Sequence, residues 1–190
     1  MRRPARDLNA LKRVLRRFRR NRRGSAVVEF AFIAPLFFLL LFAIIETAML
    51  FFAGQVLETG TQDSARLMFT NQAQSSAMTQ AQFKSDLCAR LSVLFSCGGI
   101  YVSVKAYAPG TTIPLADLAD PVSGGAFTDP TTYTMPNACD TALVRAYFQW
   151  PLYVTKLGYD ISNVTRSGSK YKLLSATAAF RVEPGASGCP

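Results

Sequence analysis

The first part of the chain changes from strongly basic to strongly apolar within a few residues. Residues 1–23 are dominated by Arg, whereas Ser25–Ala53 is apolar apart from Glu29 and Glu46. A helix from Val27 to Ala53 would be about 40 Å long, which is enough to cross a hydrocarbon core of roughly 30 Å. We therefore predict one transmembrane helix over residues 25–53.

Two other interpretations of the apolar stretch have to be considered. A buried core helix of a soluble protein does not explain its length or the Arg cluster in front of it. A secretory signal sequence is a closer alternative. However, the apolar run is followed by no A-x-A cleavage site and by no nearby Cys that could accept lipid. The pattern favours a helix that stays in the membrane.

Helical patterning continues beyond the apolar stretch. Gly54 to about Ala81 is rich in Gln, Thr, Ser and Ala and contains no Pro, so we expect the helix to continue out of the membrane. Ala81–Phe95 then predicts an amphipathic helix, because its apolar residues fall at helical spacing. These residues are Phe83, Leu87, Leu91, Leu94 and Phe95.

The rest of the chain predicts strands. Apolar and polar residues alternate in Ile100–Tyr107 and Tyr171–Glu183, and Thr141–Gln149 also resembles a strand. Pro109–Asn137 is rich in Pro, Gly, Thr and Asp and predicts a long surface loop, and Leu152–Leu157 predicts a short helical turn. The expected fold class is α+β: a long N-terminal transmembrane helix, then a small antiparallel sheet of about three strands packed against a helix.

The positive charge of the chain is concentrated at its beginning. Eleven of the 21 Lys and Arg residues lie in residues 1–23, together with only one of the 12 Asp and Glu residues. The rest of the chain therefore holds ten basic and eleven acidic residues. The body is therefore nearly neutral, and we expect no nucleic-acid partner. Because Lys and Arg next to a membrane helix stay in the cytoplasm, we expect residues 1–24 to be a cytoplasmic leader and residues 54–190 to form an extracytoplasmic domain.

The composition argues against most enzyme chemistry. The chain has no His, which excludes His-based acid–base catalysis and His-ligated metals. No nucleophile–base pair, metal cluster or phosphate-binding loop is evident in the sequence. We expect no enzymatic activity and no cofactor.

The four cysteines, Cys88, Cys97, Cys139 and Cys189, all follow the apolar helix and form no CxxC motif. They predict two disulfides in an oxidising compartment. Four cysteines allow three connectivities. We favour Cys88–Cys97, which brackets a helix end, together with Cys139–Cys189, which would hold the C-terminus.

One motif lies at the boundary between the basic leader and the apolar helix. There Gly24 is followed by Ser25, and by Glu29 and Phe30. This resembles a class III prepilin signal, which a membrane-embedded prepilin peptidase cuts after the Gly. The resemblance makes Gly24 the last leader residue, Ser25 the new N-terminus and Glu29 the fifth mature residue. The chain departs from the family at Phe30, where small pilins often have Tyr.

The resemblance extends over most of the mature chain. The segment Gly24–Glu46 is similar to the TadE family of the tight adherence (Tad/Flp) pilus system. So are Ala65–Leu67, Gln82–Lys84 with Cys88, Tyr147–Tyr159 and Leu173–Arg181. It implies a single-pass protein of the bacterial inner membrane, with its C-terminal domain in the periplasm or within the extracellular pilus. The implied partners are a prepilin peptidase, other pilins and pseudopilins contacted through the N-terminal helix, the inner-membrane assembly platform and the lipid bilayer.

The two acidic residues of the helix have different expected roles. In the family picture, Glu29 meets the free N-terminal amine of a neighbouring subunit and sets the axial stagger. Alternatively, Glu29 interacts with Ser25 and the N-terminus of its own helix. Glu46 lies 17 residues later, about 25 Å along the helix, and we expect it to be solvated at the outer interface.

Three functions remain open from the sequence. The first is a minor pilin or pseudopilin that initiates or caps a Tad pilus, which the large C-terminal domain favours. The second is an uncleaved single-pass assembly factor of the same machinery, similar to TadG. The third is an extracytoplasmic enzyme or receptor on a signal anchor. No set of catalytic residues in the sequence supports this function.

Overall fold

The structure, a computed structural model, describes residues 12, 13, 16, 24–154, 158–184 and 189. The predicted basic leader therefore lies largely outside the described residues, as does part of the turn predicted at Leu152–Leu157. The chain divides into two compact units, Met1–Phe42 and Ala43–Pro190. In the first unit the structure describes mainly the beginning of one long helix, α2, and the second unit holds the sheet.

Helix α2 runs from Ser25 to Phe69. It continues past the apolar stretch as predicted, but it ends well before Ala81. The reason lies at Asn71, which adopts a left-handed conformation with φ 57° and donates its N–H to the carbonyl of Met68. Asn tolerates this conformation better than most residues and often ends helices. A short helix, α3 (Gln72–Ser75), follows.

Helix α4 (Gln80–Leu91) is the predicted amphipathic helix, shorter at its C-terminal end than expected. A capping box starts it: the Thr79 hydroxyl accepts from the Gln82 N–H, and the Gln82 side chain accepts from the Thr79 N–H. Its apolar face is buried, including Phe83 and Leu87. A short 3-10 turn, η2 (Cys97–Gly99), leads into the sheet.

The sheet has five strands in the order β4-β1-β5-β7-β6. The three predicted strands are all present and antiparallel, as β1 (Ile100–Tyr107), β5 (Thr141–Pro151) and β7 (Ser169–Arg181). The sheet is therefore larger than the predicted one of about three antiparallel strands. At the edges lie β4 (Thr132–Tyr133), which pairs parallel to β1, and β6 (Val164–Arg166). Strands of two or three residues are too short to show an alternating pattern.

The predicted loop Pro109–Asn137 is more structured than expected. Besides β4, it contains α5 (Leu115–Leu118) and a small hairpin of β2 (Val122–Ser123) and β3 (Ala126–Phe127). Arg145 of β5 holds this region, because its buried guanidinium donates to the carbonyls of Asp117 and Ala119 and to the carboxylate of Asp120. The sequence does not indicate this role, because Arg145 simply lies in the middle of a predicted strand.

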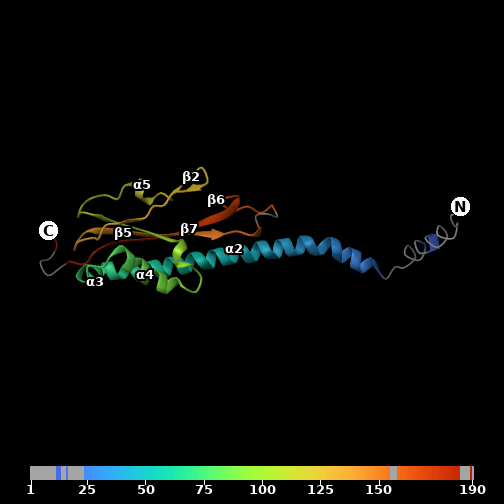
Figure 1. The fold of residues 1–190 in the computed structure, drawn as a ribbon, viewed down its shortest axis with the longest axis horizontal. Helices are drawn as coiled ribbons and strands as arrows, with labels where there is room; N and C mark the ends of the chain where they lie inside the picture. Colours follow the sequence, from blue (N-terminus) through green and yellow to red (C-terminus); the bar gives the residue numbers. More distant parts are fainter. Residues whose placement is uncertain (1–11, 14–15, 17–23, 155–157, 185–188, 190) are drawn as a thin grey trace, which may run out of the picture. The chain divides into compact units, whose positions relative to one another are not determined.

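The sheet separates two apolar layers. Figure 1 shows α2, α3 and α4 on one side of it and α5 with the β2 hairpin on the other. The larger core lies between the helices and the sheet and includes Leu57, Met68, Phe83, Leu87, Leu91, Ile100, Val102, Val104, Val144, Phe148 and Leu174. The smaller one consists of Tyr147, Val164 and Leu173, packed with Tyr101, Val122, Phe127 and Tyr171.

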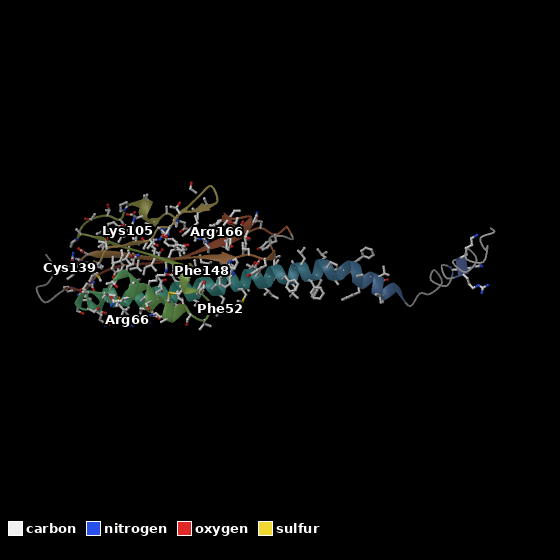
Figure 2. All side chains as sticks on the ribbon, in the orientation of Figure 1. Phe52, Arg66, Lys105, Cys139, Phe148 and Arg166 are labelled. Atoms are coloured by element: carbon white, nitrogen blue, oxygen red, sulfur yellow. A yellow bond between two sulfur atoms is a disulfide. The ribbon has the colours of Figure 1, made fainter. Side chains whose placement is uncertain are left out.

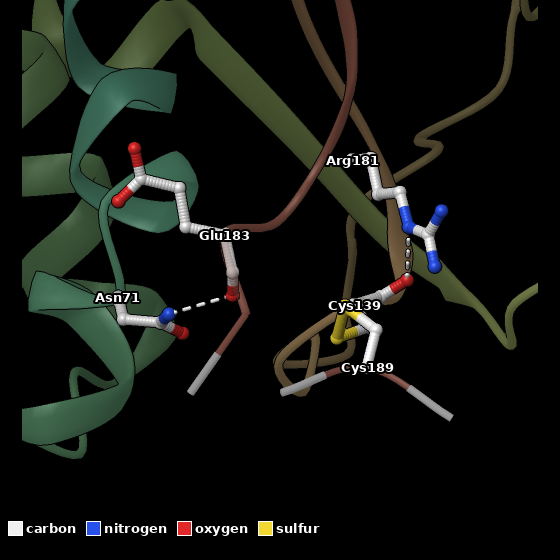
Figure 3. The surroundings of a disulfide bond; sticks show 5 residues. All are labelled: Asn71, Cys139, Arg181, Glu183 and Cys189. Atoms are coloured by element: carbon white, nitrogen blue, oxygen red, sulfur yellow. Dashed lines mark hydrogen bonds between the residues drawn. A yellow bond between two sulfur atoms is a disulfide. The ribbon is translucent and has the colours of Figure 1, made fainter. Parts of the chain in front are cut away.

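Two disulfides close the second unit. Cys88 of α4 is bonded to Cys97, and Cys139 is bonded to Cys189, with Cα atoms 5.4 and 5.6 Å apart. This is the connectivity that the sequence analysis favoured. Figure 3 shows the second bridge, whose Cys139 carbonyl also accepts from Arg181 Nε at 3.2 Å. The bridge ties the chain end to the turn before β5.

Near this bridge, the chain beyond β7 also contacts α2 and the turn after it. The Asn71 side-chain amide donates to the Glu183 carbonyl at 2.8 Å, and the Glu183 N–H donates to the Phe69 carbonyl at 3.0 Å. The C-terminal end of α2 is thus held to the end of the sheet by backbone groups as well as by packing.

Candidate functional site

The first half of α2 presents an apolar surface that the other described residues do not cover. Large apolar side chains are exposed from Val27 to Phe52, and Figure 2 shows such side chains projecting from the helix. Beyond Phe52 the helix becomes part of the core, with Ala53 and Leu57 fully buried. An apolar surface of this extent is not left to water by a stable soluble protein. Among the described residues, α2 is the helix long and apolar enough to cross a membrane.

The residues of the predicted cleavage motif stand at the beginning of this helix. Gly24 immediately precedes α2, and no described atom lies within 4 Å of the position that a Cβ would take there. Packing within the chain therefore does not require Gly at this position. Glu29 and Phe30 lie in the second turn, and both side chains are exposed. The side chain of Ser25 lies outside the described structure.

The structure places Glu46 differently from the prediction. Its side chain is only 9% exposed, and its carboxylate accepts hydrogen bonds from the backbone N–H groups of Tyr153 at 2.5 Å and Val154 at 3.2 Å. The expectation that Glu46 is solvated was wrong. The chain leaving β5 passes over the helix at this level, which a pattern along α2 alone cannot reveal.

A second carboxylate of α2 acts in a similar way. Glu58 accepts a hydrogen bond from the backbone N–H of Thr177 in β7 at 3.3 Å. Thr177 lies beyond the part of β7 that pairs with β6, which is Ser169–Tyr171. Glu46 and Glu58 thus each satisfy backbone donors that lie far away in the sequence. The sequence signal for Glu46 was a charge within an apolar stretch, which by itself does not indicate a protein partner.

A cluster of ionisable groups with shifted pKa values lies on the opposite side of the sheet. The Lys105 ammonium and the Tyr107 hydroxyl both donate to Asp117, at 2.5 and 2.6 Å, and they lower the pKa of that carboxyl. Burial, with a contribution from Asp117, raises the pKa of Tyr107 to about 12. This cluster joins α5 to β1.

The described residues offer no inorganic site. No group of three or more Cys, Asp or Glu residues in the described part of the chain is arranged to hold a metal ion. A hollow between α2 and β7 has a volume of about 360 Å³ and is lined partly by Asp63, Arg66, Phe69 and Phe180. It is open and mainly apolar, and no paired acid and base face each other in it.

Comparison with known protein families gives one result for this chain. The family model described as TadE-like protein matches residues 24–66. Neither the curated proteins nor the solved structures contain a match to the chain.

The matched region coincides with distinct features of the structure. It begins at Gly24, contains the exposed apolar part of α2, and includes Glu29, Glu46 and Glu58. The resemblance noted in the sequence is confirmed for this region. Residues 24–66 of the chain are therefore similar to the TadE-like family.

Proposed function

We propose that this chain is a minor pilin or pseudopilin that acts in the initiation or at the tip of a Tad pilus. The observation that carries the proposal is the TadE-like match over a helix whose apolar side chains are exposed from Val27 to Phe52. Such a helix suits first the bilayer and then the helical core of a pilus. The additional α+β unit favours a specialised component over a small repeating pilin.

The proposed topology follows from charge and redox chemistry. The eleven Lys and Arg of residues 1–23 hold the leader in the cytoplasm, so the sheet lies on the opposite side of the membrane. The two disulfides support this orientation, because disulfides persist in oxidising compartments. A reporter active only in the periplasm, fused after Pro190, is expected to be active. Activity of a cytoplasm-only reporter at that position would reverse the topology.

Processing is the second part of the proposal. A prepilin peptidase cuts after Gly24, removes the basic leader and leaves an amine at Ser25. A glycine allows an extended backbone to enter a protease site at little steric cost. The open surroundings of Gly24 support this role, since no described atom would contact a Cβ there.

Assembly is the third part. A carboxylate within hydrocarbon costs on the order of 3 kcal/mol on insertion scales, and Glu29 lies in the exposed apolar part of α2. In the proposed assembly, its carboxylate meets the new N-terminal amine of an adjacent pilin. The helix then passes to the inner-membrane assembly platform together with its pilin partners.

Replacing Glu29 tests the assembly role. The Glu29→Ala variant is expected to insert and to be cleaved, yet to be lost from pilin complexes isolated after cross-linking. Val28→Ala is the matched control, because Val28 is an adjacent exposed position without charge. If Glu29→Ala is recovered with other pilins as efficiently as Val28→Ala, Glu29 acts only within its own helix and the assembly role is refuted.

A further inference from the structure

The chain that follows β5 packs against α2 within the apolar part of that helix. We call residues 152–154 and 158–160 the Glu46 loop. Its Tyr153 and Val154 donate backbone N–H groups to Glu46, and the Tyr159 hydroxyl lies 3.3 Å from Thr47 Oγ1. Leu152 and Val154 are buried. The loop is therefore fixed to α2 at Glu46 and Thr47.

At the same level, other faces of α2 remain uncovered. Ile44 and Ile45 are exposed beside Glu46, and so are Met49, Phe51 and Phe52 further along the helix. Phe52 lies six residues after Glu46, about 9 Å further along the axis. The exposed apolar surface thus extends beyond the level of the Glu46 loop, and a layer of lipid that covers this surface also reaches the loop.

The length of α2 before Glu46 indicates how deep Glu46 lies in the membrane. Val27 and Glu46 are 19 residues apart, or about 29 Å along an α-helix, close to the roughly 30 Å thickness of a hydrocarbon core. A hydrocarbon core that begins at Val27 therefore ends near Glu46, and the interfacial layer lies beyond it. This puts Tyr153 and Tyr159 in the interfacial layer, where Tyr side chains are enriched because the ring is apolar and the hydroxyl remains wet.

The side chains and hydrogen bonds of the loop suit this layer. The Tyr153 side chain is 76% exposed, although its backbone N–H is bound to Glu46. Unsatisfied backbone donors are costly near lipid, and so is an unpaired carboxylate. The contact between Glu46 and the loop satisfies both, and it leaves the Tyr153 ring facing outward.

We propose that the Glu46 loop enters the outer interfacial layer of the bilayer, where Tyr153 and Tyr159 contact lipid and Glu46 fixes the loop at that depth. The globular unit is then held at the membrane by two elements, α2 and this loop. The inference rests on the proposed membrane anchoring by α2.

Photo-cross-linking to lipid tests the inference in the full chain. A benzophenone amino acid replaces Tyr153 in one variant, Phe42 in a second and Leu115 in a third, in vesicles of phosphatidylethanolamine and phosphatidylglycerol that carry alkyne-labelled acyl chains. Phe42 (51% exposed) reports the part of the apolar helix before Glu46, and Leu115 (84% exposed) reports an exposed apolar position on α5, across the sheet from α2. The replacement at Tyr153 keeps the backbone N–H that Glu46 binds.

The expected result is lipid adducts at position 153 comparable to those at position 42 and several-fold above those at position 115. If position 42 gives lipid adducts but position 153 gives no more than position 115, the inference is overturned and the membrane anchoring is left intact. Adducts at 153 to protein in place of lipid also overturn it, because the loop then faces another subunit. An absence of lipid adducts at 42 overturns the anchoring itself, and the inference with it.

Discussion

The Glu46 carboxylate accepts a hydrogen bond from the backbone N–H of Tyr153 at 2.5 Å, although 107 residues separate the two in the chain. Glu46 is one of only two charged residues in Ser25–Ala53. Within the described structure it satisfies Val154 as well. A charge that looks out of place in an apolar helix therefore has a structural partner in the sheet-bearing unit.

Removing this acceptor is expected to weaken the attachment of the loop. Glu46→Ala leaves two backbone N–H groups without their acceptor and is predicted to lower the free energy of unfolding by about 1–3 kcal/mol. Glu46→Gln keeps one carbonyl oxygen and is predicted to lose less. Denaturant unfolding in detergent micelles measures both variants. If Glu46→Ala is as stable as the wild type, the contact contributes nothing to stability.

Replacing glycine by alanine is expected to have opposite effects at two positions of α2, Gly54 and Gly60. A Cβ at Gly60 would lie 2.6 Å from Leu91 Cδ2, whereas a Cβ at Gly54 would meet no atom within 4 Å. Ala in place of Gly favours a helix by up to about 1 kcal/mol, but overpacking a buried contact costs about 1–3 kcal/mol. Gly54→Ala should therefore stabilise the protein and Gly60→Ala should destabilise it. Equal changes in unfolding free energy would contradict the close packing of α2 on α4.

The two disulfides are expected to contribute unequally. Cys88–Cys97 spans nine residues of sequence and Cys139–Cys189 spans 50. In the chain-entropy model, closing loops of these lengths contributes about 2.6 and about 4.1 kcal/mol. Replacing Cys139 and Cys189 by Ser should therefore lower the unfolding free energy by about 1.5 kcal/mol more than replacing Cys88 and Cys97. The reverse order would show that native-state interactions, not loop length, dominate the difference.

The Tyr107 hydroxyl predicts a loss of stability in alkali. Its pKa is raised to about 12 in the folded protein, above the ordinary value of about 10, so the folded state retains a proton that the unfolded state releases. This contribution is complete below pH 10 and is lost as the pH rises towards 12. Tyr107→Phe removes the hydrogen bond to Asp117, and it should be less stable at neutral pH by about 1 kcal/mol.

Measuring unfolding from pH 9 to pH 12 checks the alkaline prediction. The wild type should lose more stability over this range than Tyr107→Phe, which has no phenol to titrate. Parallel profiles for the two proteins would show that other groups account for the alkaline loss. Comparing the two proteins removes the contributions that both share.

The long, regular elements could be predicted from the sequence, and the contacts between them could not. β1 was predicted with its observed bounds, because Ile100–Tyr107 alternates cleanly. The strands β4 and β6 were missed, since their formation depends on longer neighbouring strands that provide hydrogen bonds. The early end of α2 depends on one left-handed residue, Asn71, which has no strong signal in a polar, helix-compatible stretch.

The same distinction holds for the candidate site. The apolar helix and the motif at Gly24 are local patterns, and the TadE-like match begins at that position. The burial of Glu46 depends on where the chain leaves β5, about 100 residues later. Distance along a helix indicates the depth of a residue in a membrane, but it does not indicate what packs beside it.

The central claim is that the chain is processed as a pilin, and the mass of its N-terminal peptide tests this most directly. In membranes from cells with a working prepilin peptidase, the protein is predicted to begin at Ser25, having lost Met1–Gly24. Gly24→Val should remain at full length, while Gly54→Ala, a control glycine outside the motif, should be cleaved normally. A wild-type protein that still begins near Met1 would contradict the account and identify the chain as an uncleaved, TadG-like assembly factor.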